Sequence, residues 1–449
     1  MDNITRRTIL GLCAAAGLAA CQTNRSAPTP VNAPPNPFDD FYDKSFRLSE
    51  LSADPIPAVS RPEVSAGLGD AVIDPTYATR IYRITAATPE SGAWLRHEYS
   101  RRQVFNADNS RFLAQGENGS WSLHDATTFE RIRVLERLEG DCEPLWDPHD
   151  PARFIHTARN GATTWWDQDG NVVLDLAGKT PWGDATSFWT KGEGGLSADG
   201  RRLALMATRY DEATQKNSCF GIVTVDPTIG KVIGTLDAQD FPTPGAFPDH
   251  VSIAPSGKRV VVSWLAGQGG TVAYDEKFKD QRRLIDASEH SDLAIGAAGE
   301  DLLVVADYGA GQITAINVEN GERTNLHTLY PASGEAYACH ISGQCFDRPG
   351  WVVVSSYADH TDSAPEQPAP TLRPEYRKVW LLELRAGGRA LNVAHIHANW
   401  DDVSGDSYFL EPHASASRDL SRIVFASNWG GGEINDYLVG LPSWVWTEF

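Results

Sequence analysis

The sequence predicts an all-β fold, a seven-bladed β-propeller, and three observations support this prediction. The chain of 449 residues contains 39 Gly, 14 Trp and only 2 Met, a composition that suits a repeat protein built from strands and turns. Turns rich in Ser, Asp and Gly precede short β-rich runs at intervals of roughly 40 to 70 residues. No long stretch has the 3.6-residue periodicity of an amphipathic helix.

The stretch 411–431 contains one complete repeat core and is the template for the others. A small-residue strand at 414–417 is followed by a tight turn at 418–420 and an apolar strand at 422–427, which is the inner half of a propeller blade. The turn-and-strand unit occurs six more times along the chain. Its apolar strands there are 111–114, 154–157, 203–207, 260–263, 302–306 and 351–356.

The ring of a propeller must close, because an open ring leaves a long unpaired strand edge. After residue 429 the last unit offers only one further convincing strand, 437–441, whereas residues 80–85 alternate like a strand but belong to no unit. We therefore expect this N-terminal strand to supply the outer strand of the last blade. Residues 46–449 would then form a single propeller domain.

The first 21 residues have the features of an export signal. Arg6 and Arg7 form the arginine pair of a twin-arginine signal, and the apolar run that follows ends in Leu-Ala-Ala-Cys. This run resembles a lipoprotein signal that is cut before Cys21, whose thiol is then acylated; an ordinary cleaved signal is the alternative. Residues 22–45 are expected to form a flexible tether. The expected location is the periplasm or the outer membrane, with the lipid anchor as the only membrane contact.

The composition also limits the partners. A formal net charge of −20 argues against nucleic acid and against an anionic membrane surface. An acidic saccharide stays possible, because a few arginines at one site can offset the global charge. The domain retains Cys142, Cys219, Cys339 and Cys345, for which disulfides and free buried thiols both stay open. The expected state is a monomer.

One ionisable residue stands at the head of the innermost strand in every unit. These residues are Arg102, Glu143, Glu193, His250, Asp292, His340 and His413. Because the inner strands of a propeller surround one channel, we expect their side chains to converge at its mouth. A merely wet channel would also be polar, but imidazoles beside carboxylates and an arginine shift each other's pKa values. His290 adds a fourth imidazole.

Loops on the same face of the ring supply further candidates. Arg209 and Tyr210 lie in a long loop between two strands, and Trp429 lies in the corresponding loop of the last blade. The pair His395 and His397 leads into the template unit from the same side. Aromatic platforms, scattered arginines and clustered histidines suit a sugar polymer that carries acid groups. The predicted partner is therefore an acidic polysaccharide or oligosaccharide.

The repeats from about residue 95 to 431 resemble β-propeller polysaccharide lyases of the oligogalacturonate lyase and ulvan lyase type. The resemblance rests on HEYSRRQVFNAD (97–108), HISGQCFDRPGW (340–351) and EPHASASRD (411–419). In oligogalacturonate lyases a Gln and several His hold a metal, with a QxPHxH pattern in the last blade. This chain keeps Pro412 and His413 but has Leu410 and Ser415 at the other two positions, which puts a manganese site of that kind in doubt.

Cleavage of a uronate by β-elimination needs a cation that neutralises the carboxylate, a base that removes the adjacent C–H proton, and an acid that protonates the leaving oxygen. The catalytic candidates are His250 or His413 as base with His340 beside them, Tyr99 or Tyr210 as acid, and Arg102 or Arg209 as the neutralising group. The residues expected to contact the substrate are His97, Glu143, Glu193, Asp292 and Trp429.

Three alternatives stay open. A glycoside hydrolase would use Glu143 and Glu193 as its two carboxyl groups, but the histidines would then have no role. A divalent metal (Mn, Ca or Zn) could be held by His340 and His413, with His397 or Glu411 completing the shell. A propeller that only binds a glycan or a protein is the non-catalytic alternative.

Overall fold

The computed structural model of this protein describes residues 36–57, 60–63, 67–331, 336–359 and 371–446. The chain divides into residues 1–35 and the unit Asn36–Phe449, and every described residue belongs to the second unit. The predicted signal and Cys21 lie outside the described residues. In the part of the chain that the structure describes, no helix is long and apolar enough to cross a membrane.

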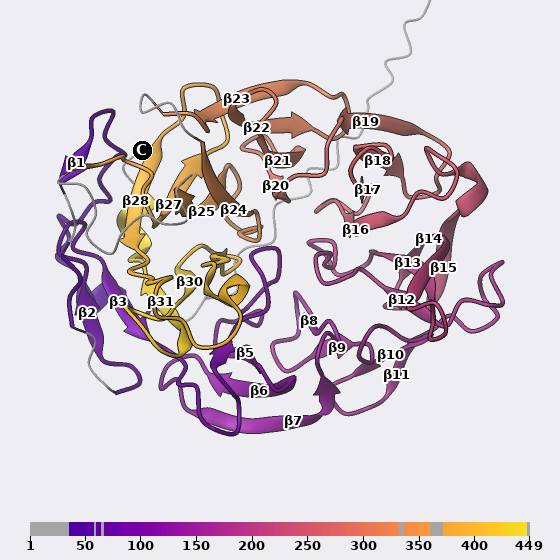
Figure 1. Cartoon of the computed structure of the whole chain (residues 1–449), viewed down its shortest axis with the longest axis horizontal. Coiled ribbons are helices and arrows are strands. Elements are labelled where there is room, and N and C mark those ends of the chain that lie inside the picture. The colour runs from indigo at the N-terminus through magenta and orange to yellow at the C-terminus, as the bar shows by residue number, and fades with distance from the viewer. Residues whose placement is uncertain (1–35, 58–59, 64–66, 332–335, 360–370, 447–449) are drawn as a thin grey trace, which may run out of the picture. The chain divides into compact units, whose positions relative to one another are not determined.

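The fold is a β-propeller whose sheets follow one another around a ring (Figure 1). Five four-stranded antiparallel sheets occur among the described residues, and their strands are as follows. The first comprises β8 (Leu145–Trp146), β9 (Phe154–His156), β10 (Thr164–Asp167) and β11 (Val172–Asp175). The second comprises β12 (Ser187–Trp189), β13 (Leu203–Asp211), β14 (Lys216–Asp226) and β15 (Lys231–Asp237). The third comprises β16 (Pro248–Ile253), β17 (Arg259–Trp264), β18 (Thr271–Asp275) and β19 (Gln281–Ile285). The fourth comprises β20 (Ser291–Ile295), β21 (Asp301–Asp307), β22 (Gln312–Asn317) and β23 (Arg323–Thr328). The fifth comprises β24 (Tyr337–Ser342), β25 (Trp351–Asp359), β27 (Lys378–Glu383) and β28 (Ala390–His395).

The remaining large sheet has nine strands and consists of two runs. One run contains β4 (Trp94–Arg96), β5 (Arg111–Gly116), β6 (Ser120–Asp125) and β7 (Arg131–Glu139). The other contains β29 (Ser415–Ala416), β30 (Arg422–Ser427), β31 (Ile434–Gly440), β3 (Arg80–Arg83) and β2 (Ala71–Ile73). They are joined where the start of β31 runs parallel to β4. With the five four-stranded sheets, these runs make seven strand groups.

Ring closure follows the prediction. The N-terminal strand β3 pairs antiparallel with β31, with Ile81 opposite Val439, and β2 adds a further strand outside it. The last sheet therefore combines strands from both ends of the domain. In Figure 1 the strands β8, β12, β16, β20 and β24 lie nearer the middle of the ring than the last strands of the groups, and β7, β11, β15, β19 and β23 lie toward the rim.

The core is a series of apolar layers between neighbouring sheets, because alternate residues of a strand point to opposite faces. In β17, Val260 and Val262 pack in one cluster with Met206 of β13, whereas Val261 packs in another with Leu303 of β21. Each sheet is thus apolar on both faces. This packing fixes the inner strands around the ring's centre.

The segment before the first repeat is part of the domain. The Asn36 side chain donates to the Leu441 carbonyl at 2.8 Å, the Tyr42 hydroxyl donates to the Gly440 carbonyl at 2.8 Å, and Phe38 is buried. The unit therefore starts at Asn36, before the predicted boundary at residue 46, because these side chains pack against the last sheet. Farther along, β1 (Ile56–Pro57) pairs with β26 (Thr371–Leu372).

The other elements are short. The 3-10 helices among the described residues are η1 (Asp39–Phe41), η2 (Ala238–Asp240), η3 (Ser407–Leu410) and η4 (Ser443–Trp446). The cysteines left open by the sequence are all free thiols: Cys142, Cys219, Cys339 and Cys345.

Candidate functional site

The structure brings together the seven residues that head the repeats. Contacts connect them around the ring's centre: Arg102 Nη2 lies 3.6 Å from Glu143 Oε1, and His250 Nδ1 lies 3.2 Å from Glu193 Oε2. Six of the seven are buried, and only Glu193, with 28% of its side chain exposed, reaches solvent to a notable degree. Most of these side chains are therefore shielded from solvent, whereas they were expected from the sequence at the mouth of the channel.

Several of them lie within the inner strands. His250, Asp292 and His340 lie within β16, β20 and β24 instead of preceding them. Glu143 and His413 precede β8 and β29 and have left-handed backbones, with φ of 53° and 41°. Such conformations are uncommon for residues other than glycine and concentrate at functional sites.

His97 holds the backbone of His413 in this conformation. Its Nε2 donates to the His413 carbonyl at 2.7 Å, and its Nδ1 lies 2.7 Å from Asp436 Oδ1. All three residues are buried. Because both ring nitrogens are occupied, His97 acts through His413 and is a positioning residue, although the sequence suggested contact with the substrate.

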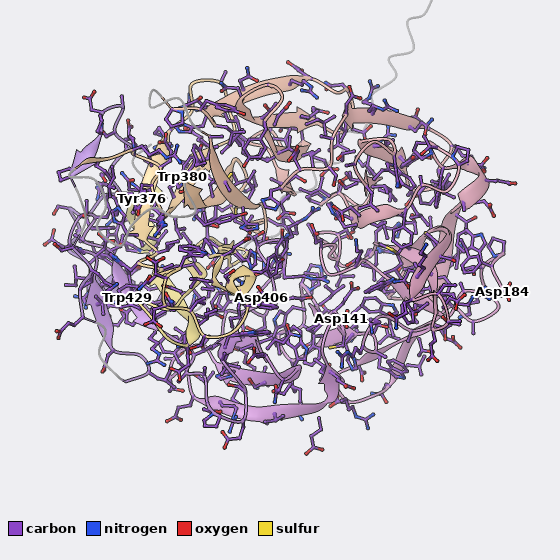
Figure 2. The ribbon with its side chains drawn as sticks, viewed as in Figure 1. Asp141, Asp184, Tyr376, Trp380, Asp406 and Trp429 are labelled. Atoms are coloured by element: carbon purple, nitrogen blue, oxygen red, sulfur yellow. The ribbon has the colours of Figure 1, made fainter. Side chains whose placement is uncertain are left out.

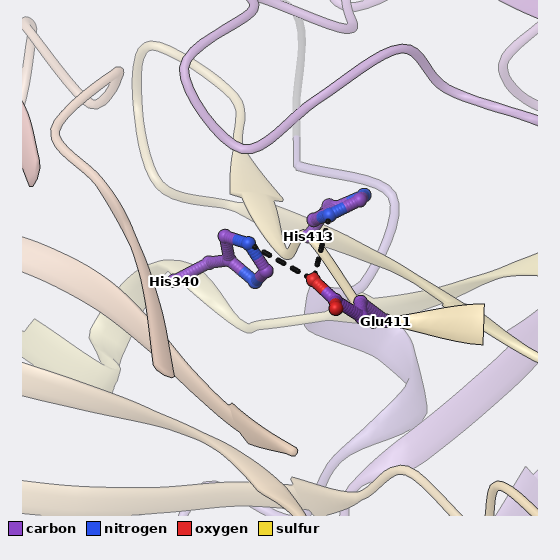
Figure 3. Close-up of side chains that lie close together, drawn as sticks. All are labelled: His340, Glu411 and His413. Carbon is purple, nitrogen blue, oxygen red and sulfur yellow. Dashed lines mark ion pairs between the residues drawn. The ribbon is translucent and has the colours of Figure 1, made fainter. Parts of the chain in front are cut away.

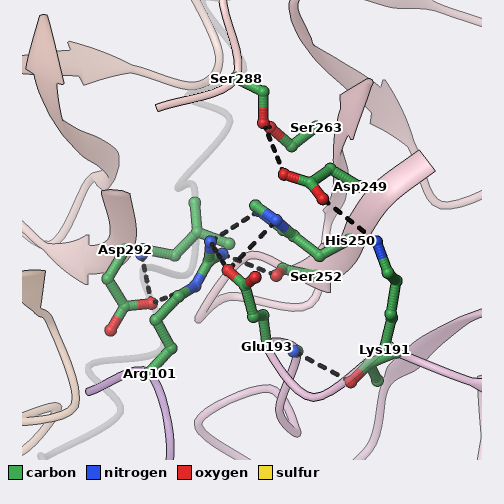
Figure 4. A network of polar contacts seen from close by, with 12 residues as sticks. Arg101, Lys191, Glu193, Asp249, His250, Ser252, Ser263, Ser288 and Asp292 are labelled. Atoms are coloured by element: carbon green, nitrogen blue, oxygen red, sulfur yellow. Dashed lines mark hydrogen bonds and ion pairs between the residues drawn. The ribbon is translucent and has the colours of Figure 1, made fainter. Parts of the chain in front are cut away.

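Arg101 connects four groups at the centre (Figure 4). Its Nη1 lies 2.6 Å from His250 Nε2 and 3.3 Å from Glu193 Oε2, its Nε lies 3.5 Å from Asp292 Oδ1, and its Nη2 donates to Ser252 Oγ at 2.8 Å. A guanidinium only donates, so the lone pair on His250 Nε2 is already used. Burial, and to a smaller extent the charge of Arg101, hold the pKa of His250 well below its usual value. His250 is therefore a neutral acceptor here, with no free lone pair for a base.

Arg102 and Glu143 hold the loop after β12. The Arg102 guanidinium donates to the Gly194 carbonyl and pairs with Glu98 at 3.2 Å. The fully buried Glu143 carboxylate accepts from the backbone N–H of Thr190 at 2.9 Å and of Gly192 at 2.6 Å. Neither group is accessible, so the hydrolase alternative loses Glu143 as one of its two carboxyl groups.

His340, Glu411 and His413 form a cluster that could hold a metal ion (Figure 3). The Nε2 atoms of His340 and His413 lie 3.3 and 3.4 Å from the same Glu411 Oε2, and the three ligand atoms are within 4.8 Å of one another. Both Nε2 atoms are buried and lack hydrogen bonds within the described residues. Burial holds the pKa of both imidazoles well below the usual value, which favours the neutral form that binds metals. This donor set fits a divalent metal with positions left open.

The surroundings of His413 differ from those of a typical metal ligand. Ligating histidines usually donate their second ring N–H to an acceptor, whereas His413 Nδ1 lies 2.5 Å from Nη2 of the buried Arg96. Because a guanidinium only donates, a neutral His413 ring has its lone pair on Nδ1 and its proton on Nε2, and Nε2 must lose that proton before it binds a cation. We therefore expect a metal site roughly 10- to 100-fold weaker than one with an acceptor at Nδ1. At the two positions where the QxPHxH pattern has Gln and the second His, this chain has Leu410 and Ser415. Leu410 is buried, and the Ser415 hydroxyl donates to the Arg102 carbonyl at 2.7 Å.

His290 is the imidazole best arranged to accept a proton. Its Nδ1 donates to the Cys339 carbonyl at 3.0 Å, which leaves the lone pair on Nε2. Its ring stacks on His340 with centroids 4.4 Å apart, and it is only partly buried. Burial lowers the pKa of His290, so the ring is neutral at pH 7. In contrast to His250 and His413, no arginine occupies its free nitrogen among the described contacts.

Of the other candidates, the structure brings only Tyr99 to this cluster. The Tyr99 ring centroid lies 4.7 Å from that of His413 and 5.5 Å from that of His340. Arg209 pairs with Asp184 at 3.7 Å, and Figure 2 shows Asp184 at the periphery of the ring. Tyr210 is half exposed on the same hairpin. The pairing of β13 with β14 continues as far as Asp211, which lies opposite Lys216. This long hairpin carries the side chains of Arg209 and Tyr210 away from the channel.

His397 and Trp429 also lie apart from the metal cluster. Their rings contact each other with centroids 4.7 Å apart, and Trp429 stacks on Tyr437 at 4.7 Å. The Trp429 indole donates to the Pro62 carbonyl at 2.9 Å. In the described residues the metal cluster takes Glu411 as its third member and does not include His397.

No protein-family model matches this chain, and no curated protein matches its sequence. Among solved structures it is similar to an oligogalacturonate lyase in complex with manganese, with a TM-score of 0.57, 17% identity, and coverage of 87% of this chain and 100% of the other. It is also similar to the oligogalacturonate lyase of Vibrio parahaemolyticus, with a TM-score of 0.57, 14% identity, and coverage of 83% and 97%. At identities this low, the similarity shows a shared fold alone. The chain thus shares the β-propeller fold of oligogalacturonate lyases.

Proposed function

We propose that this protein is an exported polysaccharide lyase that cleaves a uronic-acid-containing polysaccharide or oligosaccharide by β-elimination in the propeller channel. The observation that carries the proposal is one cluster in which His290, with a directed lone pair, stacks on a group of cation ligands that also contacts Tyr99. The shared fold with two oligogalacturonate lyases supports it. Export and acylation at Cys21 rest on the sequence signal, and the expected state is a monomer.

Each step of the elimination has a residue in this cluster. Nε2 of His290 takes the proton from C5 of the uronate while the C4–O4 bond breaks and the C4–C5 double bond forms. The Tyr99 hydroxyl donates its proton to the departing O4. Burial raises the pKa of Tyr99 well above its usual value, so the phenol is protonated and available at neutral pH. Arg101 and His97 position His250 and His413 around this centre.

A divalent metal at His340, Glu411 and His413 would neutralise the substrate carboxylate and acidify the C5 proton. Manganese is the first candidate, because it is present in one similar lyase structure, and calcium and zinc are the others. Arg96, fully buried behind His413, adds a fixed positive charge.

The product distinguishes the candidate functions. Incubation with ulvan, pectin or glucuronan should yield the ultraviolet absorbance of an unsaturated uronate together with new reducing ends. New reducing ends without absorbance would instead indicate hydrolysis by Glu98 and Glu193, which line one cavity and whose pKa values are raised chiefly by burial, that of Glu98 to about 7. Binding without either product would indicate a glycan-binding propeller.

Metal removal tests the cation site. We expect a chelator to reduce lyase activity by about 10-fold or more, with recovery on addition of Mn²⁺, because the charge on the substrate carboxylate is then uncompensated. His340→Ala should lower Mn²⁺ affinity, measured by calorimetry, by about 10- to 100-fold. His397→Ala is the matched control and should leave the affinity unchanged. Equal losses in both variants would overturn the assignment of His340 as a ligand.

A further inference from the structure

A cavity of about 390 Å³ lies beside the histidine cluster, and Tyr99 borders both. Tyr99 and Glu193 line the cavity and also contact residues of the central site. The aromatic part of the wall contains Phe409 and Tyr408, whose rings meet edge to face at 5.3 Å, and 48% of Tyr408 is exposed. The volume is that of a small-ligand pocket. Because Tyr99, the proposed acid, lines this cavity, a sugar next to the cleaved residue can extend into it.

Carboxylates dominate the charge of this cavity. The acidic lining residues are Glu98, Glu117, Asp141 and Glu193. Arg102 and Arg101 offset two of them, since they pair with Glu98 at 3.2 Å and with Glu193 at 3.3 Å. Within the described residues, Glu117 and Asp141 form no ion pair and accept hydrogen bonds from backbone N–H groups only.

The two cations of the lining are already engaged. Arg159 pairs with Glu139 at 3.4 Å, and Lys191 pairs with Asp249 at 3.2 Å. Neither Glu139 nor Asp249 lines the cavity. A second uronate placed here would therefore face the carboxylates of Glu117 and Asp141, and it could gain a cation only by breaking one of these two ion pairs. In Figure 2 Asp141 lies toward the middle of the ring, in contrast to Asp184.

We propose that this cavity binds a neutral sugar, so that the preferred substrate has a neutral sugar linked to O4 of the uronate that is cleaved. The inference rests on the proposed lyase function. Exposed aromatic surface at Tyr408 packs on the C–H face of a sugar ring, and Gln115, Glu117 and Asp141 offer acceptors and donors to its hydroxyls. A homopolymer of uronates would place its next carboxylate in this acidic cavity.

Matched polymers test this preference. Hyaluronan and desulfated ulvan alternate a uronate with an uncharged sugar, whereas glucuronan and polygalacturonate contain uronates only. We expect kcat/KM to be at least about 10-fold higher on the better alternating polymer than on either homopolymer, since one like-charge contact near a surface has about this effect. Equal or higher kcat/KM on a homopolymer would overturn the inference while leaving the lyase function intact.

Charge removal in the cavity supplies the second measurement. In Asp141→Asn combined with Glu117→Gln, the ratio of homopolymer to alternating-polymer kcat/KM should rise by about 3- to 10-fold. Asp184→Asn, a peripheral exposed carboxylate, should leave the ratio unchanged. An unchanged ratio in the cavity variant would overturn the inference. If no polymer is cleaved, the lyase function fails, and calorimetry with neutral and uronate oligosaccharides then tests the cavity alone: tighter binding of the uronate oligosaccharide would overturn it.

Discussion

Replacing His290 with glutamine should lower kcat by about 100- to 10,000-fold, the range for loss of a general base. Glutamine is close to histidine in length, and its amide can still donate to the Cys339 carbonyl that His290 Nδ1 contacts at 3.0 Å. What it lacks is a basic lone pair beside His340. The measurement is the initial rate of ultraviolet absorbance on the best uronate polymer, with thermal unfolding in parallel to show that the fold is retained.

His149→Gln is the control for this variant, since His149 is exposed in a turn outside the cluster. It should change neither the rate nor the melting temperature. A loss smaller than about 10-fold in His290→Gln would assign proton removal to another group. Retention of activity in His250→Gln would be consistent with the occupied lone pair of that ring.

Replacing Arg101 with methionine should lower the free energy of unfolding by about 3–5 kcal/mol, the usual cost of removing one partner from a buried ion pair. The guanidinium is 2% exposed, and its loss leaves Asp292 and Glu193 without their cation. Burial raises the pKa of Asp292, and Arg101 opposes that rise. In the variant, the Asp292 carboxyl group is therefore either an unpaired buried charge or protonated. Urea denaturation measures the change.

Arg159→Met is the matched control, because the ion pair of Arg159 with Glu139 is exposed on both sides. It should cost less than about 1 kcal/mol. A similar cost in both variants would mean that Arg101 does not stabilise the centre.

The fold was predictable because each propeller strand has a recognisable local pattern in the sequence. Each apolar strand follows a turn with Ser, Asp or Gly, and β3 (Arg80–Arg83) was recognisable as a strand that no repeat could use. Its pairing with β31 confirms the predicted closure. The start of the domain was less predictable, since Phe38 and Tyr42 pack against the last sheet from a segment whose composition resembles a linker.

Only those site residues that recur at the same position of each repeat were predictable. Alignment on the turns identifies one residue per unit, so it identified Arg102 but not its neighbour Arg101, which connects four groups. It also could not show that His250 Nε2 faces a guanidinium whereas His290 Nε2 does not, since ring orientation depends on tertiary contacts. Arg209 was misplaced because loop length does not reveal the direction in which a hairpin projects.

The parallel contact between Ile434 and Trp94 and the ladder between Ile81 and Val439 have a consequence for biosynthesis. The strand that pairs with Ile81 is translated near the end of the chain. Until then, β3 has an unpaired edge that other strands can contact. Contacts so distant in sequence slow folding, and an unmatched edge invites association between chains. Molecules released from the ribosome without residues 434–440 should therefore accumulate as aggregates instead of as a smaller soluble ring.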